Sequence, residues 1–264
     1  MTSFDRAIKT APGQRTWNDV AYFLALSKVQ LDKAQQYAES AVTEIENDLR
    51  NAELSQLRTD DLENVSTLAA NWDTLGFVYF QKGDLDRAEK YIAAAWLLDQ
   101  QGEVGYHLGQ IHEKRGNKEA AIRLYAQAAG LTGTVPEAAE SLERLVGKEK
   151  VAELLRSGNV ESNSSRTLNL GRPQTNAKGT TEARFYVSLI PGPAGMAQVA
   201  DIKFISGDDK LKPMAGLLKT GKFGLVFPGE RATKVIRRGT LSCKGANGEC
   251  TFIMITPDSV TSIE

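Results

Sequence analysis

The sequence predicts a multidomain protein: an all-α array of helical hairpins, followed by a small α+β domain with one sheet and one helix. Three observations support this fold class. Two segments in the first half repeat each other at helical spacing, a polar stretch without apolar periodicity follows residue 157, and alternation of period two begins near residue 182. We expect a helical domain over residues 1–157, a linker over 158–181 and the sheet domain over 182–264.

The composition is typical of a globular chain that is long enough for two hydrophobic cores. The chain has 264 residues, of which 41% are hydrophobic and 25% are charged. Its formal net charge of −1 gives no general attraction to nucleic acid or anionic lipid. No apolar run approaches the roughly 18 to 20 residues that span a bilayer, and residues 1–17 lack the apolar segment of a signal peptide. We expect no direct membrane insertion and no nucleic-acid partner. The N-terminal segment is interpreted either as the start of a cytosolic protein or as a position inside a longer protein.

The clearest internal repeat consists of residues 69–101 and 102–130. Seven positions match when the first segment is shifted by the 33 residues that separate Leu75 from Leu108. The matched pairs are Leu75 and Leu108, Gly76 and Gly109, Tyr79 and His112, Gly83 and Gly116, Ala88 and Ala121, Ile92 and Tyr125, and Ala95 and Ala128.

The small residues of the repeat predict a pair of closely packed helices in each copy. Gly76 lies inside a helical pattern, where glycine costs about 1 kcal/mol relative to alanine. Such a residue is tolerated where a neighbouring helix must approach the backbone, and Ala88 is small at the facing position. Gly83 and Gly116 supply the left-handed residue that ends the first helix of each pair.

This pattern resembles the tetratricopeptide repeat. The second copy departs from the family at Gly105 and His112, where the family has Trp and an aromatic residue, and neither copy has the closing Pro. A degenerate copy over about residues 15–45 and capping helices over 135–157 complete the expected array. In the first clear copy the signature positions are Trp72, Leu75, Gly76, Tyr79, Gly83, Ala88 and Ala95.

The resemblance implies a partner-binding surface on the concave face of the array. In this family, side chains at fixed positions of the first helix of each repeat line that face and bind a protein or peptide. The alternative is that Phe23, Phe77 and Phe80 pack internally against an additional helical segment. The positions carried over from the family are Asp19, Phe23, Leu26, Asp73, Phe77, Phe80, Gln81, Tyr106, Gln110, Glu113 and Lys114.

The second domain is expected to have the order β-β-α-β-β-β, with a hairpin turn at Asn247-Gly248. RTLNL, residues 166–170, is either a short strand or a docking arm. The stretch from Val199 to Cys243 resembles the C-terminal domain of TonB-type energy transducers. The expected elements are strands at 183–190 and 198–207, a helix within 208–221, and strands at 222–229, 233–245 and 249–257.

Cys243 and Cys250 flank the expected hairpin turn and can face each other across two strands. We interpret the pair as a disulfide, which indicates an extracytoplasmic, periplasmic setting. The alternative is two reduced cysteines in a cytoplasmic protein. Neither a further metal ligand nor the redox C-x-x-C spacing lies nearby.

The chain has no recognisable catalytic motif. His107 and His112 are five residues apart on one helix, so they do not share a face and cannot form a metal pair. No phosphate-binding loop, nucleophile elbow or zinc-binding helix motif is present. We therefore predict no catalytic residues, no metal and no cofactor. The basic cluster of Arg231, Lys234, Arg237 and Arg238 is interpreted as a solvated strand edge rather than a nucleic-acid surface.

Together these patterns favour a non-catalytic scaffold or adaptor segment that binds a peptide or partner domain on the concave face. Three alternatives remain open. In the first, the chain is part of a larger bacterial envelope enzyme or transport system whose chemistry lies in other domains. In the second, it is an enzyme with a cleft between its domains. In the third, its repeats form a homodimer.

Overall fold

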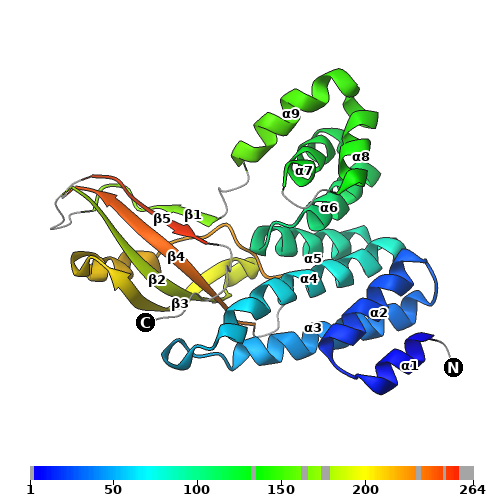
Figure 1. The fold of residues 1–264 in the computed structure, drawn as a ribbon, viewed down its shortest axis with the longest axis horizontal. Helices are drawn as coiled ribbons and strands as arrows, with labels where there is room; N and C mark the ends of the chain where they lie inside the picture. Colours follow the sequence, from blue (N-terminus) through cyan, green and yellow to red (C-terminus); the bar gives the residue numbers. More distant parts are fainter. Residues whose placement is uncertain are drawn as a thin grey trace. The chain divides into compact units, whose positions relative to one another are not determined.

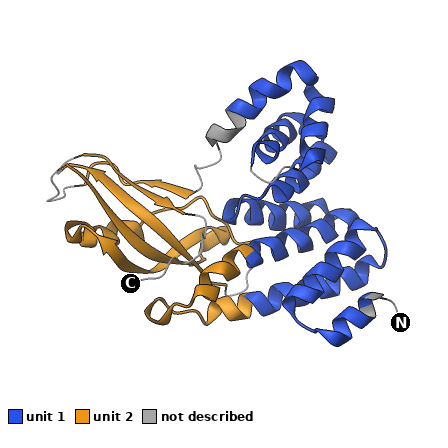
Figure 2. Cartoon of the chain, in the orientation of Figure 1, with its two compact units in different colours: residues 1–45, 67–162 blue, residues 46–66, 163–264 orange. Residues whose placement is uncertain are grey.

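The structure, a computed structural model, describes residues 3–131, 135–161, 166–173, 179–229, 233–245 and 248–255. The chain forms two compact units (Figure 2). Unit 1 consists of residues 1–45 and 67–162, and unit 2 of residues 46–66 and 163–264. Unit 1 is helical and unit 2 contains a five-stranded sheet, so the predicted fold class is confirmed.

Unit 1 is a succession of helices in which neighbours along the chain pack against each other (Figure 1). Two of the helices, α3 and α4, extend into unit 2 at the connection between them. No helix in the described part of the chain is long and apolar enough to cross a membrane. The helices are α1 Ser3–Thr10, α2 Gln14–Leu26, α3 Leu31–Arg50, α4 Thr59–Lys82, α5 Leu85–Leu98, α6 Gly102–Lys114, α7 Lys118–Gly130, α8 Pro136–Val146 and α9 Lys148–Glu161.

The turns inside the two clear repeats have the expected chemistry. Gly83 and Gly116 follow α4 and α6 with φ of 85° and 78°, in the left-handed region that glycine adopts without strain. Asp84 and Asn117 then cap the next helix, and each side chain accepts a hydrogen bond from the backbone amide three residues later, at 3.0 and 3.3 Å. A left-handed glycine followed by a helix-capping residue therefore forms the turn in both hairpins.

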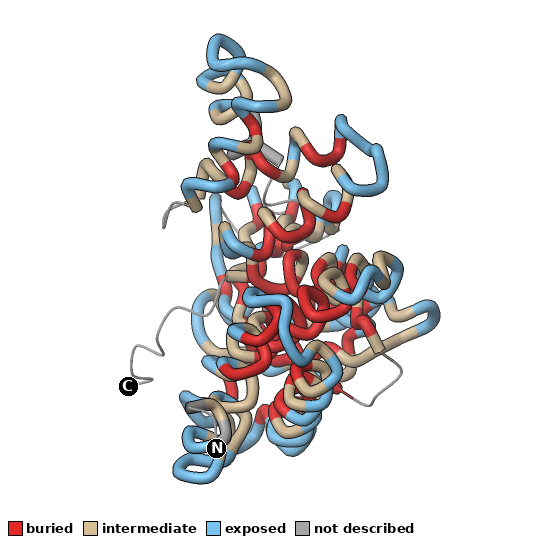
Figure 3. The backbone as a smooth tube through the Cα atoms, turned by 90° about the vertical axis from the view of Figure 1, so that its right-hand side faces the viewer, coloured by how far each residue is buried: buried red, intermediate tan, exposed pale blue. Residues whose placement is uncertain are grey.

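The glycines inside the helices mark the closest helix contacts. A Cβ atom added to Gly76 would lie 2.4 Å from Cγ1 of Ile92, and one added to Gly109 would lie 2.5 Å from Cε1 of Tyr125. Figure 3 shows buried and exposed stretches alternating along the helices, as expected when one face of each helix is in the core. The predicted close approach of the paired helices is confirmed.

The end of the array differs from the prediction by a few residues. We expected the last capping helix to stop at Gly158, but α9 continues to Glu161. A single glycine inside a helix costs about 1 kcal/mol, which is too little to end the helix by itself.

Unit 2 is built on an antiparallel sheet with strand order β1-β5-β4-β2-β3 (Figure 1). The helical segment between β3 and β4 begins as η4 Asp209–Met214 and continues as α10 Ala215–Lys219, and a short turn, η3 Pro193–Gly195, joins β2 to β3. The strands are β1 Thr167–Asn169, β2 Thr180–Pro191, β3 Ala197–Gly207, β4 Val235–Lys244 and β5 Cys250–Met254.

The strand predicted over residues 222–229 is wrong, and β1 is the fifth strand instead. Only an isolated bridge between Val226 and Met196 forms in that region. Phe223, Leu225 and Phe227 are nevertheless buried at alternate positions. Their period of two therefore reflects an extended connection packed on the core, with backbone hydrogen bonds from Ala197 to Leu225 and from Phe227 to Gly195 in place of a continuous ladder.

Residues 46–66 belong to the sheet unit and interrupt the helical domain expected over 1–157. This segment contains the end of α3, the short helix η1 Leu54–Gln56 and the start of α4. Its apolar side chains share a buried cluster with the sheet, which explains why it belongs there. The buried members are Ala52, Leu54, Leu62, Tyr186 and Ile236.

Two lysines hold the same segment through its backbone. Lys203 donates to the carbonyl oxygen of Leu54 at 2.8 Å, and Lys234 donates to that of Ala52 at 2.7 Å. The predicted solvated strand edge at the basic cluster is wrong, because β4 lies between β5 and β2 and Arg237 is only 2% exposed. Arg231 and Asn247, named in the sequence predictions, lie outside the described residues.

Cys243 and Cys250 are joined by a disulfide across the β4–β5 pair. They stand directly opposite each other in the strand register, with 4.2 Å between their Cα atoms. Both side chains are fully buried in unit 2. The bridge therefore ties the ends of the two strands together inside the core.

Candidate functional site

Two adjoining cavities in unit 1 lie between the first helices of successive hairpins, α2, α4 and α6. Their volumes are about 330 and 450 Å³, and both are lined by Tyr22 and Glu103. The first cavity is lined by Asn18, Asp19, Tyr22, Phe23, Ala70, Asp73, Thr74, Gln101, Glu103 and Val104. The second is lined by Tyr22, Leu26, Lys28, Phe77, Gln81, Glu103, Tyr106, His107, Gln110, Val135, Pro136 and Glu137. We call the two cavities together the groove.

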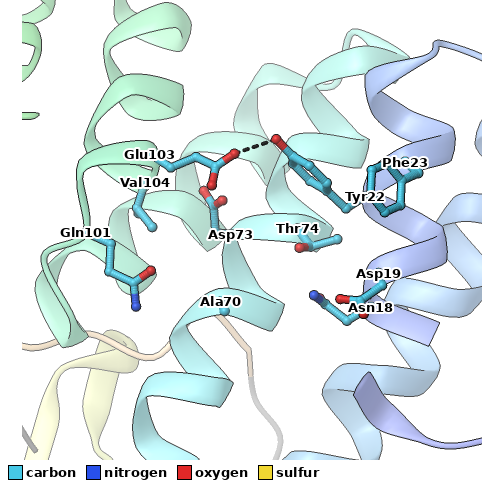
Figure 4. Close-up of a pocket in the computed structure, with 10 residues that line it drawn as sticks. All are labelled: Asn18, Asp19, Tyr22, Phe23, Ala70, Asp73, Thr74, Gln101, Glu103 and Val104. Atoms are coloured by element: carbon cyan, nitrogen blue, oxygen red, sulfur yellow. Dashed lines mark hydrogen bonds between the residues drawn. The ribbon is translucent and has the colours of Figure 1, made fainter. Parts of the chain in front are cut away.

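A hydrogen bond between Tyr22 and Glu103 separates the two cavities. The Tyr22 hydroxyl donates to Oε1 of Glu103, across the space between α2 and α6 (Figure 4). Burial of the ring, and then the bond to the carboxylate, raise the pKa of Tyr22 well above its usual range. The hydroxyl therefore stays protonated and remains a hydrogen-bond donor throughout the physiological range.

Asp73 and His107 form a buried pair at the groove. Asp73 belongs to the lining of the first cavity and His107 to that of the second. Nδ1 of His107 is 3.0 Å from Oδ2 of Asp73, and the two side chains are 4% and 8% exposed. The His107 ring also stacks on Phe77, with 4.3 Å between the ring centroids. Burial alone would lower the pKa of His107, but the charge and the hydrogen bond of Asp73 outweigh it, so the pKa is raised above 6.5.

Replacing Asp73 by asparagine should lower the pKa of His107 below 6.5, because the burial penalty remains while the opposing carboxylate is lost. In the native chain the folded state raises this pKa, so the pair stabilises unit 1 most below pH 6.5 and less as the pH rises through the folded-state value. An NMR titration of the imidazole Cε1 proton measures the change. His112 is the only other histidine and supplies the internal control. An unchanged His107 titration in the asparagine variant would contradict the pairing.

Eight of the eleven residues predicted for the concave face line the groove. They come from three helices and line both cavities, as the repeat pattern implies. The eight are Asp19, Phe23, Leu26, Asp73, Phe77, Gln81, Tyr106 and Gln110.

The other three predicted residues, Phe80, Glu113 and Lys114, line neither cavity. Nζ of Lys114 lies 4.9 Å above the Phe80 ring, in a cation–π contact. Glu113 forms an ion pair of 2.7 Å with Arg144 and accepts a hydrogen bond of 2.8 Å from Tyr125. These contacts engage the three side chains within unit 1.

The aromatic residues of the groove divide into packed and available ones. Phe77 is 4% exposed and contacts the rings of Tyr22, Phe80 and His107. It therefore packs internally, but its ring partners lie on α2, α4 and α6 and not on the additional helical segment. Phe23 is 52% exposed. An exposed ring on the wall of a cavity is available to a ligand, whereas Phe77 shapes the cavity from behind.

Sequence reasoning missed Tyr22, Glu103 and the start of α8. Glu103, Tyr106 and Gln110 follow one another at helical spacing, so the pattern around Tyr106 could have identified Glu103. No such signal marks Pro136 or Glu137, since α8 was expected only to cap the array. Their position at the second cavity depends on how α8 packs.

The groove has the character of a binding surface. Among the residues that the structure describes, no three His, Cys, Asp or Glu side chains are placed to hold one metal ion. His112 lies apart from the groove, 3.7 Å from Glu89. The groove instead offers aromatic rings, carboxylates and amide groups from several helices, which recognise a ligand by shape and charge.

Comparison with known proteins supports the repeat assignment. The family model described as "Tetratricopeptide repeat" matches residues 69–101 and 104–134, which confirms the two clear repeats. A solved structure described as "Functional Characterization of Pseudomonas Aeruginosa pilF" is similar at 16% identity and a TM-score of 0.41, over 60% of this chain and 64% of that chain. A search of curated proteins found no match. The family match lies outside residues 199–243, so the resemblance of that stretch to TonB-type domains stays a prediction.

Proposed function

We propose that unit 1 is a non-catalytic scaffold that binds a peptide or a segment of a partner protein in the groove. The observation that carries this proposal is the convergence of eight repeat-derived positions on two adjoining cavities. The matched repeats support it, because tetratricopeptide-type hairpins present their first helices toward a ligand.

Exposed apolar side chains at the groove provide the binding energy in this proposal. Phe23 and Leu26 are 52% and 53% exposed, although they line cavities in a folded helical unit. Large apolar side chains in such positions are typical anchors of protein interfaces, where a few residues supply most of the affinity. A bound segment would remove both from water.

The double substitution Phe23→Ala and Leu26→Ala should weaken binding at least tenfold, since it removes both exposed anchors. It should change the free energy of unfolding by only about 0.5 kcal/mol, because both side chains are already largely in water. The ligands are peptides selected from a random dodecapeptide library on the native chain, and fluorescence polarisation measures their affinity. Val29→Ala is the matched control, since Val29 is 46% exposed and lines neither cavity. Equal affinity for the double variant and the native chain would refute the groove assignment.

We further infer that the protein works in an extracytoplasmic compartment, as part of a bacterial envelope system. The supporting observation is the buried disulfide of unit 2. Structural disulfides persist in oxidising compartments and are rare where thiol buffers keep cysteines reduced.

Reduction of the disulfide should lower the free energy of unfolding of unit 2 by about 2.5 kcal/mol, from the loss of a short closed loop in the unfolded chain. Urea unfolding with and without a reductant measures the difference. Alkylation of the protein from its native source, after denaturation but before reduction, should label neither cysteine. Full labelling at Cys243 and Cys250 would place the protein in a reducing compartment.

A further inference from the structure

Carboxylates outnumber cations along the groove. Asp19, Asp73 and Glu103 line the first cavity, and Glu137 joins Glu103 at the second. Lys28 is the one lysine or arginine in the two described linings. Asp73 already has His107 as its partner, so the charge that remains on the surface is negative.

The groove carboxylates differ from three carboxylates on the second helices of the hairpins. Asp32, Asp86 and Glu119 lie on α3, α5 and α7, and each is paired with a lysine or arginine at 2.6, 2.5 and 3.2 Å. Asp19, Glu103 and Glu137 enter no ion pair among the residues that the structure describes. These three carboxylates of the second helices are therefore neutralised by cations of the same chain, whereas Asp19, Glu103 and Glu137 at the groove are not.

The charges of the groove carboxylates also act on Tyr22, which lines both cavities. After burial and the hydrogen bond to Glu103, the remaining causes that raise the pKa of Tyr22 are the charges of nearby carboxylates. This negative field suits a cationic ligand that donates hydrogen bonds to the carboxylates.

We propose that the groove recognises a basic segment of a partner protein, with an arginine or lysine side chain in the first cavity and an apolar side chain against Leu26 in the second. The proposal rests on the proposed function and names the chemistry of its ligand. The rings of Tyr22 and Phe23 border the first cavity together with its carboxylates (Figure 4). A guanidinium group fits that lining best, because its flat face stacks on aromatic rings while its edge donates to several oxygens.

The test is a selection of peptides on the full chain from a random dodecapeptide library, at physiological salt. Two triple variants are compared with the native chain. The groove variant carries Asp19→Asn, Glu103→Gln and Glu137→Gln. The control variant removes the same number of charges from the second helices, by Asp32→Asn, Asp86→Asn and Glu119→Gln.

We expect the selected peptides to be enriched in arginine and lysine, and to bind the groove variant at least tenfold more weakly than the control variant. Their affinity should fall as salt is added. Peptides that depend on Phe23 and Leu26 but carry no basic enrichment would leave the groove function standing and overturn its charge specificity. Basic peptides that bind both triple variants equally would show general attraction to an acidic surface and overturn the proposal. If the groove substitutions weaken the binding of no selected peptide, both the proposed function and this inference are refuted.

Discussion

Replacing Gly76 by valine should lower the free energy of unfolding of unit 1 by about 3 kcal/mol or more. The new Cβ would stand 2.4 Å from Cγ1 of Ile92 and 3.1 Å from the carbonyl oxygen of Ala88, so α4 and α5 would have to separate. Valine also brings two further methyl groups into a contact that already has no room for one. Urea denaturation followed by circular dichroism at 222 nm measures the loss, since unit 1 supplies most of the helix.

Two further variants separate the steric cause from the general effect of changing a glycine. Gly216→Val places the same side chain at a helical glycine of α10 where the added Cβ meets no atom within 4 Å, so its cost should be small. The pair Gly76→Ala and Ile92→Ala should be more stable than the sum of the two single changes predicts, because the second removes the atom that the first collides with. Additive losses would show that the close approach is not the cause.

Replacing Leu54 by aspartate should lower the free energy of unfolding of unit 2 by about 4 kcal/mol. Leu54 is 7% exposed and shares a cluster with Tyr186 and Ile236 of the sheet. The change removes a packed leucine and places an unpaired carboxylate among apolar side chains, and both losses count in full at a buried site. Urea unfolding followed by near-ultraviolet circular dichroism, which senses the packing of Tyr186, measures the loss.

The control for this variant adds the same charge two residues away. Gln56 lies in the same short helix as Leu54 and is exposed, so Gln56→Asp should change stability by only about 0.5 kcal/mol. If Leu54→Asp behaved like Gln56→Asp, residues 46–66 would not be part of the sheet unit.

The helical hairpins were predictable because their signals lie close together in the sequence. Gly83 followed by Asp84 contains both the end of one helix and the cap of the next, within two residues. The 33-residue shift then makes the same signal visible twice. Glycine and capping residues act through their own backbone and their nearest neighbours, so no distant contact is needed to interpret them.

The wrong strand prediction over residues 222–229 shows what alternating hydrophobicity does not determine. Phe223, Leu225 and Phe227 alternate as in a strand and are buried as in a strand, yet the segment forms only an isolated bridge, at Val226. Alternation reports which side chains face the core, whereas a strand also requires a neighbouring backbone that continues the hydrogen bonding over several residues. The short RTLNL segment found such a neighbour in β5 and became β1.

The sequence by itself determined the class of each half of the chain, the position of the two clear repeats and eight of the residues that line the groove. Only the tertiary structure decided that residues 46–66 complete the sheet unit, where Lys203 and Lys234 bind backbone atoms 149 and 182 positions away. It also decided that Tyr22 meets Glu103 across 81 positions and separates the two cavities. The physical reason is the same in both cases: helix periodicity, caps and turns are interactions between near neighbours, whereas a partner distant in the sequence is chosen by how whole helices and strands pack.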